Sequence, residues 1–291
     1  MASVGFIGLG AMGMPMATRL LKGCSRLSVM DAMPCKVQSM VEHGAVGTSL
    51  LEMTKTVEIV FMSLPAEASR ATVQTMLPHL QRHHVVIDCS TTSPQQAAET
   101  AGLVRSQGAD FLDAPVSGLP KRAAEGALTC MVGGEESTCE RLKPLLDSMC
   151  TKVVHVGDAG HGQLAKAMNN CTYNISIAAM AEMLPMAAKL GLKPEAFAEV
   201  IEHGSGASFG FNQWAPVVLR RAFEPGIGYP MGEAEKDLQN IEQAATAAGI
   251  EVGPLQRGMS ETYRAALQMG CADLHKGAMT LVHEKRLAVT V

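Results

Sequence analysis

Short apolar runs recur at regular intervals over about the first 160 residues, and segments with helical spacing separate them. Runs that are apolar throughout are typical of strands buried on both faces of a parallel sheet. A regular alternation of such strands with helices predicts a doubly wound sheet with helices packed on each side. We expect strands at Val4–Gly8, Leu27–Met30, Val57–Met62, Val85–Cys89, Ala109–Asp113, Ala127–Val132 and Val153–Val156.

Two of the intervening segments start with residues that begin helices. Ser49 is followed three positions later by Glu52, and Ser93 is followed by Pro94 and then Gln96. A serine in this position accepts a hydrogen bond from a backbone N–H of the first turn, and proline suits the first helical position. We therefore expect helices to start directly after Ser49 and Ser93.

The pattern changes after about residue 160, where the strand signal stops and helical segments follow one another. His161–Leu190 is a long run rich in Ala, Met and Leu, and Pro185 within it predicts a kink or a local break. Later helices are expected over Pro194–Glu202, Asn212–Phe223, Glu233–Ala248, Pro254–Met269 and a tail from Asp273. The chain thus predicts an α/β Rossmann domain with a mostly parallel sheet over residues 1–160 and an all-α domain over residues 161–291, joined by one long helix.

Composition and charge remove several classes of function. The net charge is −4, and no basic run is longer than a pair such as Arg220–Arg221, which argues against nucleic acid as a partner. No apolar stretch has the length of a membrane span. The strand expected at Val4 leaves no room for a signal peptide, so we expect a cytoplasmic protein. The 8 cysteines form no metal-binding pattern and are interpreted as reduced thiols, and no metal site is expected.

The loop Gly8-Leu9-Gly10-Ala11-Met12-Gly13 joins the first expected strand to the helix that follows it. In such a loop the first glycine allows a tight turn, the second lets the backbone approach a pyrophosphate, and the third lets the helix pack on the strand. The N–H groups at the start of the helix favour an anion. A glycine-rich turn without a ligand is the alternative interpretation, and the strand–turn–helix context favours a dinucleotide site.

Asp31 ends the second expected strand, about 20 residues after the glycine loop. A carboxylate there accepts hydrogen bonds from the adenosine ribose and repels a 2′-phosphate. No arginine follows it in Ala32-Met33-Pro34, and Lys36 is the nearest cation. The sequence therefore predicts NAD as the cofactor in preference to NADP.

Polar residues follow three of the expected strands, at Ser63-Leu64-Pro65, Ser90-Thr91-Thr92 and Asp113-Ala114-Pro115-Val116-Ser117-Gly118. Ligands of this fold bind at the carboxyl ends of the strands. We expect the hydroxyls of the second segment to meet the nicotinamide side of the cofactor, although any one of them serves equally well as a helix cap. The third segment can present a hydroxyl and backbone N–H groups to a carboxylate.

Lys166 lies near the start of the long helix, with Asn169 beside it and Asn170 on the same face one turn later. A lysine near the start of an apolar helix is more often a surface residue when it is taken alone. Here small residues flank it at the expected junction of two domains, where partial burial would lower its pKa toward the working range of a general acid–base. His155 and His161 are alternative groups for this role, and we interpret His161 as a cap or loop residue.

Together these motifs resemble the beta-hydroxyacid dehydrogenase family, which includes 3-hydroxyisobutyrate dehydrogenase. The resemblance implies an NAD-dependent oxidoreductase that moves a hydride between nicotinamide and the hydroxyl carbon of a small 3-hydroxy acid. The blocks that carry it are Gly5-Phe6-Ile7-Gly8-Leu9-Gly10-Ala11-Met12-Gly13-Met14-Pro15-Met16-Ala17, Asp113–Gly118, Gly162-x-x-x-Lys166-x-x-x-Asn170 and Lys236-Asp237-Leu238. They span most of the chain in the family's order.

The resemblance also implies roles for individual residues. Lys166 would be the general acid–base, Asn170 would orient the substrate, and Ser117 would complete the catalytic set. The expected substrate-binding residues are Ser117, Gly118, Leu119, Asn169, Asn170 and Asp237. The expected cofactor-binding residues are Gly8, Gly10, Ala11, Met12, Gly13, Asp31, Leu64, Pro65, Thr91 and Lys236.

Two features leave the substrate open. Many members of the family have a second glycine where this chain has Leu119, and a side chain there would narrow the pocket or move the loop. The segment Ser205–Asn212 is expected to form another wall of the pocket.

We expect a homodimer or homotetramer, because the Ala- and Met-rich helices could bury a subunit interface.

Other functions fit parts of the pattern. A phosphogluconate-type dehydrogenase would resemble a longer chain, an imine reductase commonly lacks a lysine at the position of Lys166, and a tartronate semialdehyde reductase shares the family's motifs. An NAD-binding protein without catalysis need not keep Lys166, Asn170 and Ser117 together, as this chain does.

Overall fold

In a computed structural model, which describes residues 3–291, the chain divides into two compact units. The first unit is Met1–Lys166 and the second is Ala167–Val291. One helix, α8 (His161–Lys189), begins in the first unit and continues into the second. Within residues 3–291 no helix is long and apolar enough to cross a membrane.

The first unit is built on a sheet that has nine strands within the described residues. Their order is β3-β2-β1-β4-β5-β6-β8-β7, with β9 paired to β8, and the pairs from β3 to β6 are all parallel. The strands are β1 (Ser3–Ile7), β2 (Arg26–Met30), β3 (Val46–Gly47), β4 (Ile59–Met62), β5 (Val85–Asp88), β6 (Asp110–Asp113), β7 (Val116–Ser117), β8 (Leu128–Gly133) and β9 (Cys150–Gly157). The expected mostly parallel Rossmann sheet is confirmed. Strands β3 and β7 were not predicted, because two residues are too few to show a strand pattern.

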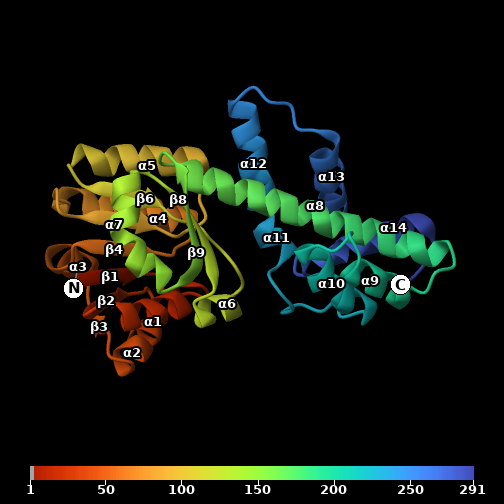
Figure 1. The fold of residues 1–291 in the computed structure, drawn as a ribbon, viewed down its shortest axis with the longest axis horizontal. Coiled ribbons are helices and arrows are strands. Elements are labelled where there is room, and N and C mark those ends of the chain that lie inside the picture. Colours follow the sequence, from red (N-terminus) through yellow and green to blue (C-terminus); the bar gives the residue numbers. More distant parts are fainter. Residues whose placement is uncertain (1–2) are drawn as a thin grey trace. The chain divides into compact units, whose positions relative to one another are not determined.

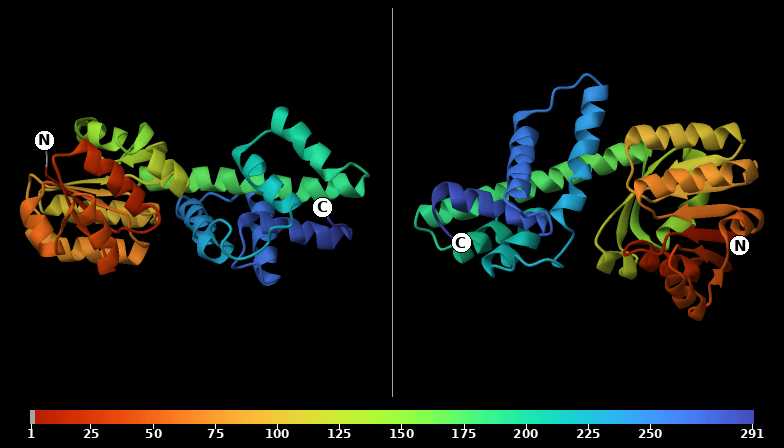
Figure 2. Two further views of the ribbon diagram at one scale, coloured as in Figure 1. Left: turned by 90° about the horizontal axis from the view of Figure 1, so that it is seen from below. Right: turned by 180° about the vertical axis from the view of Figure 1, so that it is seen from behind.

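Side chains of the sheet alternate between two apolar cores. On β4, Ile59 and Phe61 belong to one core, and Val60 and Met62 belong to the other. Helices cover both faces of the sheet, which is why its central strands are apolar throughout (Figures 1 and 2). The first core is covered by α1 (Gly13–Gly23), α2 (Pro34–Glu42), α6 (Pro120–Glu125) and α7 (Glu136–Asp147), and the second by α3 (Leu50–Thr56), α4 (Ala66–Met76) and α5 (Pro94–Ser106).

The two helix starts expected from the sequence are confirmed. The Oγ of Ser49 accepts a hydrogen bond from the N–H of Glu52 at 3.3 Å. The Oγ of Ser93 accepts one from the N–H of Gln96 at 3.1 Å. Both caps satisfy N–H groups that the first turn of a helix leaves without a backbone partner.

The strand order reverses at β1, where the chain first moves outward to β3 and then returns to β4 on the other side of β1. At such a switch point the connections after the two neighbouring strands run to opposite faces of the sheet. Ligands of doubly wound folds bind there, outside the carboxyl ends of the strands. In this fold the loops after β1, β4, β5 and β6 are therefore the candidate ligand-binding loops.

The second unit is all-helical across residues 167–291, as expected. Its core includes Ile177 and Met180 of α8 together with Trp214 and Tyr263. After α8 its elements are α9 (Pro194–His203), α10 (Phe209–Leu219), α11 (Met231–Ala234), α12 (Lys236–Ala247), α13 (Pro254–Gln268), the 3₁₀ turn η2 (Lys276–Met279) and α14 (Thr280–Leu287).

Helix α8 continues through Pro185 to Lys189, so of the two expected outcomes the local break does not occur, and a kink there stays a prediction. A proline inside a helix removes one backbone hydrogen bond. Here Ala181 and Leu184 are completely buried in the second unit's core. Tertiary packing of this kind commonly outweighs a local preference for ending the helix.

Two other boundaries differ from the expected ones. Helix α10 begins at Phe209, since the Oγ of Ser208 accepts a hydrogen bond from the N–H of Phe211 at 3.1 Å. The last four residues of the segment Ser205–Asn212 are therefore helical. The single helix expected over Glu233–Ala248 is divided into α11 and α12 at Glu235.

Candidate functional site

The glycine loop connects β1 to α1, and its three glycines meet different surroundings. Gly8 has a φ of +94°, and a Cβ there would lie 2.3 Å from the backbone oxygen of Ser63. A Cβ on Gly13 would lie 1.8 Å from the oxygen of Gly8. Gly10 differs, because no heavy atom lies within 4 Å of the position its Cβ would take. Packing inside the protein thus requires glycine at the first and third positions, and the second leaves room for a bound group.

The start of α1 suits an anion. Its N-cap residue, Met12, makes no side-chain hydrogen bond to the first turn, and that turn contains no acidic residue. The partial positive charge at a helix N-terminus is therefore not offset by a capping carboxylate here. With the open position at Gly10, this arrangement fits the pyrophosphate of a dinucleotide.

Asp31 is bound to the glycine loop itself. Its Oδ2 accepts a hydrogen bond from the N–H of Leu9 at 2.6 Å, and its Oδ1 accepts one from the N–H of Met33 at 2.8 Å. An ionised carboxylate has about four acceptor positions, so two remain after these bonds. Asp31 thus holds the loop in place and still has acceptors for a ribose. The contact with Leu9 was not predicted from the sequence, and binding of the ribose stays a prediction.

The loops after β4 and β5 are joined to each other. The N–H of Leu64 donates to the Oγ of Ser90 at 2.9 Å, which fixes the segment that contains Pro65, the N-cap residue of α4. The N–H of Ser90 and the hydroxyl of Ser69 donate to the two oxygens of Asp88, at 2.9 and 2.6 Å. Burial raises the pKa of the Asp88 carboxyl, and these hydrogen bonds oppose the rise.

Asp113, at the end of β6, holds the start of α8. This carboxyl is completely buried, and its two oxygens accept hydrogen bonds from the N–H groups of Gly160 and Gln163, each at 2.8 Å. A carboxylate against the first turn of a helix satisfies its N–H groups and its dipole. Burial raises the pKa of Asp113, and the two backbone hydrogen bonds oppose the rise. The sequence analysis singled out neither Asp88 nor a cap role for Asp113.

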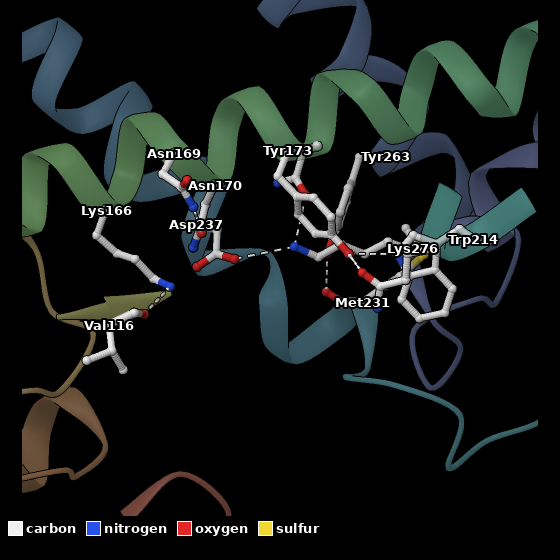
Figure 3. A network of polar contacts seen from close by, with 12 residues as sticks. Val116, Lys166, Asn169, Asn170, Tyr173, Trp214, Met231, Asp237, Tyr263 and Lys276 are labelled. Carbon is white, nitrogen blue, oxygen red and sulfur yellow. Dashed lines mark hydrogen bonds and ion pairs between the residues drawn. The ribbon is translucent and has the colours of Figure 1, made fainter. Parts of the chain in front are cut away.

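Lys166 lies one turn after this cap. Its side chain is half-buried, and its Nζ donates a hydrogen bond to the backbone oxygen of Val116 at 2.7 Å (Figure 3). Val116 and Ser117 form β7, which pairs with β8. The structure therefore brings Lys166 to the segment that carries Ser117 and Gly118.

The residues around Ser117 adopt defined conformations. Gly118 has a φ of +141°, and a Cβ there would lie 2.6 Å from a methyl carbon of Leu128, so only glycine fits. Leu119 is the N-cap residue of α6, with an extended backbone (φ −88°, ψ 168°). Its side chain is 47% exposed. Leu119 is thus accommodated without backbone strain.

Four other expected site residues, Asn169, Asn170, Lys236 and Asp237, belong to the second unit. Asn170 lies one turn after Lys166 on α8, and its Oδ1 accepts a hydrogen bond from the Nδ2 of Asn169 at 3.3 Å. Lys236 and Asp237 begin α12, and the Nζ of Lys236 lies 5.9 Å from the centre of the Tyr229 ring. Two helices of the second unit thus supply these residues: α8 carries Asn169 and Asn170, and the start of α12 carries Lys236 and Asp237.

A buried lysine that the sequence analysis missed contacts this group. The Nζ of Lys276 lies 2.9 Å from the Oδ1 of Asn174 and 3.4 Å from the Oδ2 of Asp237, and also 5.5 Å from the centre of the Tyr173 ring (Figure 3). Burial lowers the pKa of Lys276, and the charge of Asp237 opposes this effect. No local sequence pattern around Lys276 predicts these contacts, because both Asn174 and Asp237 lie in distant segments of the chain.

The two histidines considered as alternatives occupy different positions. The Nε2–H of His155 donates to the backbone oxygen of Gly134 at 2.7 Å. His161 is the exposed first residue of α8. Within residues 3–291 no cluster of three or more His, Cys, Asp or Glu side chains is arranged to hold a metal ion.

Comparisons with known proteins cover nearly the whole chain. Residues 3–157 match the family model of the NAD binding domain of 6-phosphogluconate dehydrogenase. Residues 160–282 match the model described as NAD-binding of NADP-dependent 3-hydroxyisobutyrate dehydrogenase.

Individual relatives are similar over their full length. The 3-hydroxyisobutyrate dehydrogenase of Pseudomonas aeruginosa is 38% identical, with 96% of this chain and 93% of that protein covered. The 2-(hydroxymethyl)glutarate dehydrogenase of Eubacterium barkeri is 32% identical, with 99% and 97% covered. A solved structure of 3-hydroxyisobutyrate dehydrogenase from Mycobacterium tuberculosis with L-serine is 33% identical, with a TM-score of 0.87 and 97% and 99% covered. The chain therefore belongs to the beta-hydroxyacid dehydrogenase family and is an NAD-dependent oxidoreductase.

Proposed function

We propose that this chain catalyses the reversible oxidation of a small 3-hydroxy acid to its aldehyde, with Lys166 as the general acid–base. The observation that supports this most is the 2.7 Å hydrogen bond from the Nζ of Lys166 to the backbone oxygen of Val116. It holds an amine beside Ser117 and Gly118, at the edge of the sheet where this fold binds its ligands. A proton-transfer group and a carboxylate-binding segment thus belong to one unit.

The substrate class follows from what the relatives' substrates share. 3-Hydroxyisobutyrate and 2-(hydroxymethyl)glutarate, named for two relatives, and L-serine, present in the related structure, are all 3-hydroxypropanoates with a substituent on C2. Each has a primary alcohol two carbons from a carboxylate. We expect this chain to oxidise the same group, while the C2 substituent that it prefers depends on the pocket.

The side chains divide the work as follows. In the oxidation, neutral Lys166 accepts the hydroxyl proton as the C–H bond breaks and the C=O bond forms; in the reduction its ammonium returns a proton to the oxygen. Asn170 orients the hydroxyl, and Ser117 with the N–H groups near Gly118 and Leu119 binds the carboxylate. Asn169 and Asp237 complete the substrate contacts. Bound NAD supplies the hydride acceptor.

The cofactor contacts rest on the glycine loop and Asp31. The open space at Gly10 and the uncapped start of α1 suit the pyrophosphate, which would contact the N–H groups of Ala11, Met12 and Gly13. Asp31 binds the adenosine ribose and disfavours a 2′-phosphate, so NAD is preferred to NADP. We assign Leu64, Pro65 and Thr91 to the nicotinamide side of the cofactor, and we assign Lys236 a cofactor contact.

The test is a Lys166→Ala variant measured with 3-hydroxyisobutyrate, L-serine and 2-(hydroxymethyl)glutarate. Loss of a general acid–base lowers the rate by roughly 10²–10⁴-fold, and binding of NADH should be unchanged. Lys189→Ala, which removes an exposed lysine from the last turn of the same helix, is the matched control. Near-full turnover of the Lys166 variant would contradict its assignment. If wild-type protein binds NADH but oxidises none of the three acids, the substrate class is wrong.

The assembly state is a separate part of the proposal. We expect a homodimer or homotetramer formed through helices of the second unit, where Leu190, Val200 and Leu255 are 76%, 67% and 74% exposed. Exposed apolar side chains such as these would be removed from water in an assembly. Light scattering after size exclusion measures the mass directly, and a monomer at all concentrations would contradict this expectation.

A further inference from the structure

Gln163 is a buried polar residue in the first turn of α8, and it makes three hydrogen bonds. Its backbone N–H donates to the Oδ2 of Asp113 at 2.8 Å. Its side-chain Oε1 accepts from the N–H of Thr92 at 3.1 Å, and its Nε2 donates to the backbone oxygen of Ser90 at 2.7 Å. The side chain is only 1% exposed. A primary amide is suited to this position, because it supplies an acceptor and a donor at once.

The start of α8 is packed directly against backbone. A Cβ on Gly162 would lie 2.6 Å from the oxygen of Met131 and 2.7 Å from the oxygen of Asp113. A Cβ on Gly160, which has a φ of +95°, would lie 2.7 Å from the oxygen of Pro94. Such close approach leaves the helix little freedom to shift. The Gln163 amide therefore spans a fixed distance to the loop after β5.

The two ends of this connection carry groups that the proposed reaction needs. Lys166 follows Gln163 by three residues, and therefore lies on a neighbouring part of the same helical face. Thr91 stands between Ser90 and Thr92, the two residues whose backbone Gln163 holds. The same loop is bound to Leu64 through the Oγ of Ser90. One side chain thus joins the helix of the acid–base to the loops on the nicotinamide side.

We propose that Gln163 is a positioning residue that sets the separation between Lys166 and the Ser90–Thr92 loop during hydride transfer. This rests on the proposed function, because it gives Lys166 and Thr91 their roles. Gln163 itself does not touch the reacting atoms. It acts by keeping the proton acceptor and the cofactor loop in register, and a misplacement of about 1 Å at a reacting group can cost roughly 10²-fold in rate.

The test replaces Gln163 by methionine, which has a similar length but no donor or acceptor and is tolerated in buried positions. Gln96→Met is the matched control, since the Nε2 of Gln96 also donates to a backbone oxygen of the same unit, that of Ala66, at 2.9 Å. The measurements are kcat, the dissociation constant of NADH, and the primary deuterium isotope effect on kcat with substrate labelled at the carbinol carbon.

We expect Gln163→Met to lower kcat by about 10- to 100-fold and to raise the isotope effect, because hydride transfer becomes slower relative to product release. Its affinity for NADH should stay near that of the wild type, and Gln96→Met should keep kcat within about twofold. A folded Gln163→Met protein with wild-type kcat would overturn the proposal. So would equal losses of kcat and NADH affinity in both variants, which would show a general weakening of the unit.

A second variant guards against misfolding. If Gln163→Met does not fold, Gln163→Glu keeps an acceptor for Thr92 and, when ionised, replaces the donor to Ser90 by a second acceptor. The same fall in kcat is therefore expected at a pH where the new carboxyl is ionised, and its absence there overturns the proposal. The two proposals fail separately. An inactive Lys166→Ala with a fully active Gln163→Met rejects only the positioning role, whereas a fully active Lys166→Ala rejects the proposed function.

Discussion

The two units fix their polar groups in different ways. In the first unit, carboxylates and amides hold backbone, as Asp31 holds Leu9 and Asp113 holds Gly160. In the second unit, the central polar group is a buried ion pair between side chains, Lys276 with Asp237. Backbone hydrogen bonds fix loops at the edge of a sheet, whereas a buried charge must be matched by another charge brought from a distant helix. The comparison teaches that the first unit depends on close backbone approach and the second on charge balance.

Among the variants that test this comparison, we expect Lys276→Met to lower the free energy of unfolding the most. Removing one partner of a buried pair leaves the other uncompensated and costs about 3–5 kcal/mol in the free energy of unfolding. The side chains of Lys276 and Asp237 are only 9% and 13% exposed, and the Oδ1 of Asn174 would lose its donor as well. Urea unfolding followed by circular dichroism measures the change.

Two further variants control this measurement. Arg257→Met breaks an exposed pair in the same unit, with side chains 53% and 84% exposed, and should cost less than about 1 kcal/mol. Adding Asp237→Leu to Lys276→Met should recover part of the lost stability, since it removes the unpaired charge. Equal effects of the Lys276 and Arg257 variants would show that the second unit does not depend on its buried pair.

In the first unit the corresponding test concerns backbone approach. Gly162→Ala places a Cβ against the oxygens of Met131 and Asp113, and overpacking of this kind costs about 1–3 kcal/mol. Gly10→Ala meets no atom within 4 Å and should leave unfolding unchanged, but weaken NAD binding because it fills the space proposed for the pyrophosphate. Unfolding curves and NADH titrations of both variants separate the two effects. A Gly10 variant that binds NADH like the wild type would show that this space is not used.

The smallest expected effect is a difference in the response of the units to acid. Burial lowers the pKa of His275 and His283 in the second unit, so the unfolded chain takes up protons near its usual value of 6.5 while the folded unit does not. Stability is therefore full above that value and is lost as pH falls below it. Burial lowers the pKa of His84 in the first unit too.

Buried carboxyls act in the opposite direction in the first unit. Burial raises the pKa of Asp88 and Asp113, so between their usual value of 3.8 and the raised value the folded state holds more protons, and stability rises as pH falls. Trp214 is the single tryptophan of the chain and stacks on His275 at 4.4 Å, so its fluorescence reports on the second unit. We unfold the protein with urea at about pH 7.5 and at about pH 5.5 and follow both Trp214 fluorescence and the loss of NADH binding. We expect the urea midpoint from Trp214 fluorescence to fall more between these pH values than the urea midpoint from NADH binding. A Trp214 midpoint that does not move would refute this assignment.

The sequence predicted those features that depend on neighbours along the chain. The buried strands, the caps at Ser49 and Ser93 and the spacing of the glycine loop are local patterns, and the structure agrees with them. Pro185 does not break α8, because packing of the second unit's core overrides the local preference, and a kink there stays a prediction. The roles of the individual site residues stay predictions.

The structure added contacts that no local pattern contains. Gln163 binds Thr92, which is 71 positions away, and Lys276 binds Asn174, which is 102 positions away. Asp31 binds Leu9 across 22 positions. Folding of the core brings such partners together, and the sequence of one segment alone does not predict these contacts. The candidate site therefore stays a prediction from the sequence, and the long-range hydrogen bonds show which partners fix its segments.

The double attachment of Asp31 has a consequence for attempts to redesign cofactor preference. Exchanging an acidic residue here for a small neutral one is a direct way to admit the 2′-phosphate of NADP. In this chain the exchange also removes the acceptor for the N–H of Leu9, inside the loop that we propose binds the phosphates. Selection for a new cofactor would thus loosen the structure that binds any dinucleotide. Asparagine or serine, which keep an oxygen at that place, are better starting points than alanine or glycine.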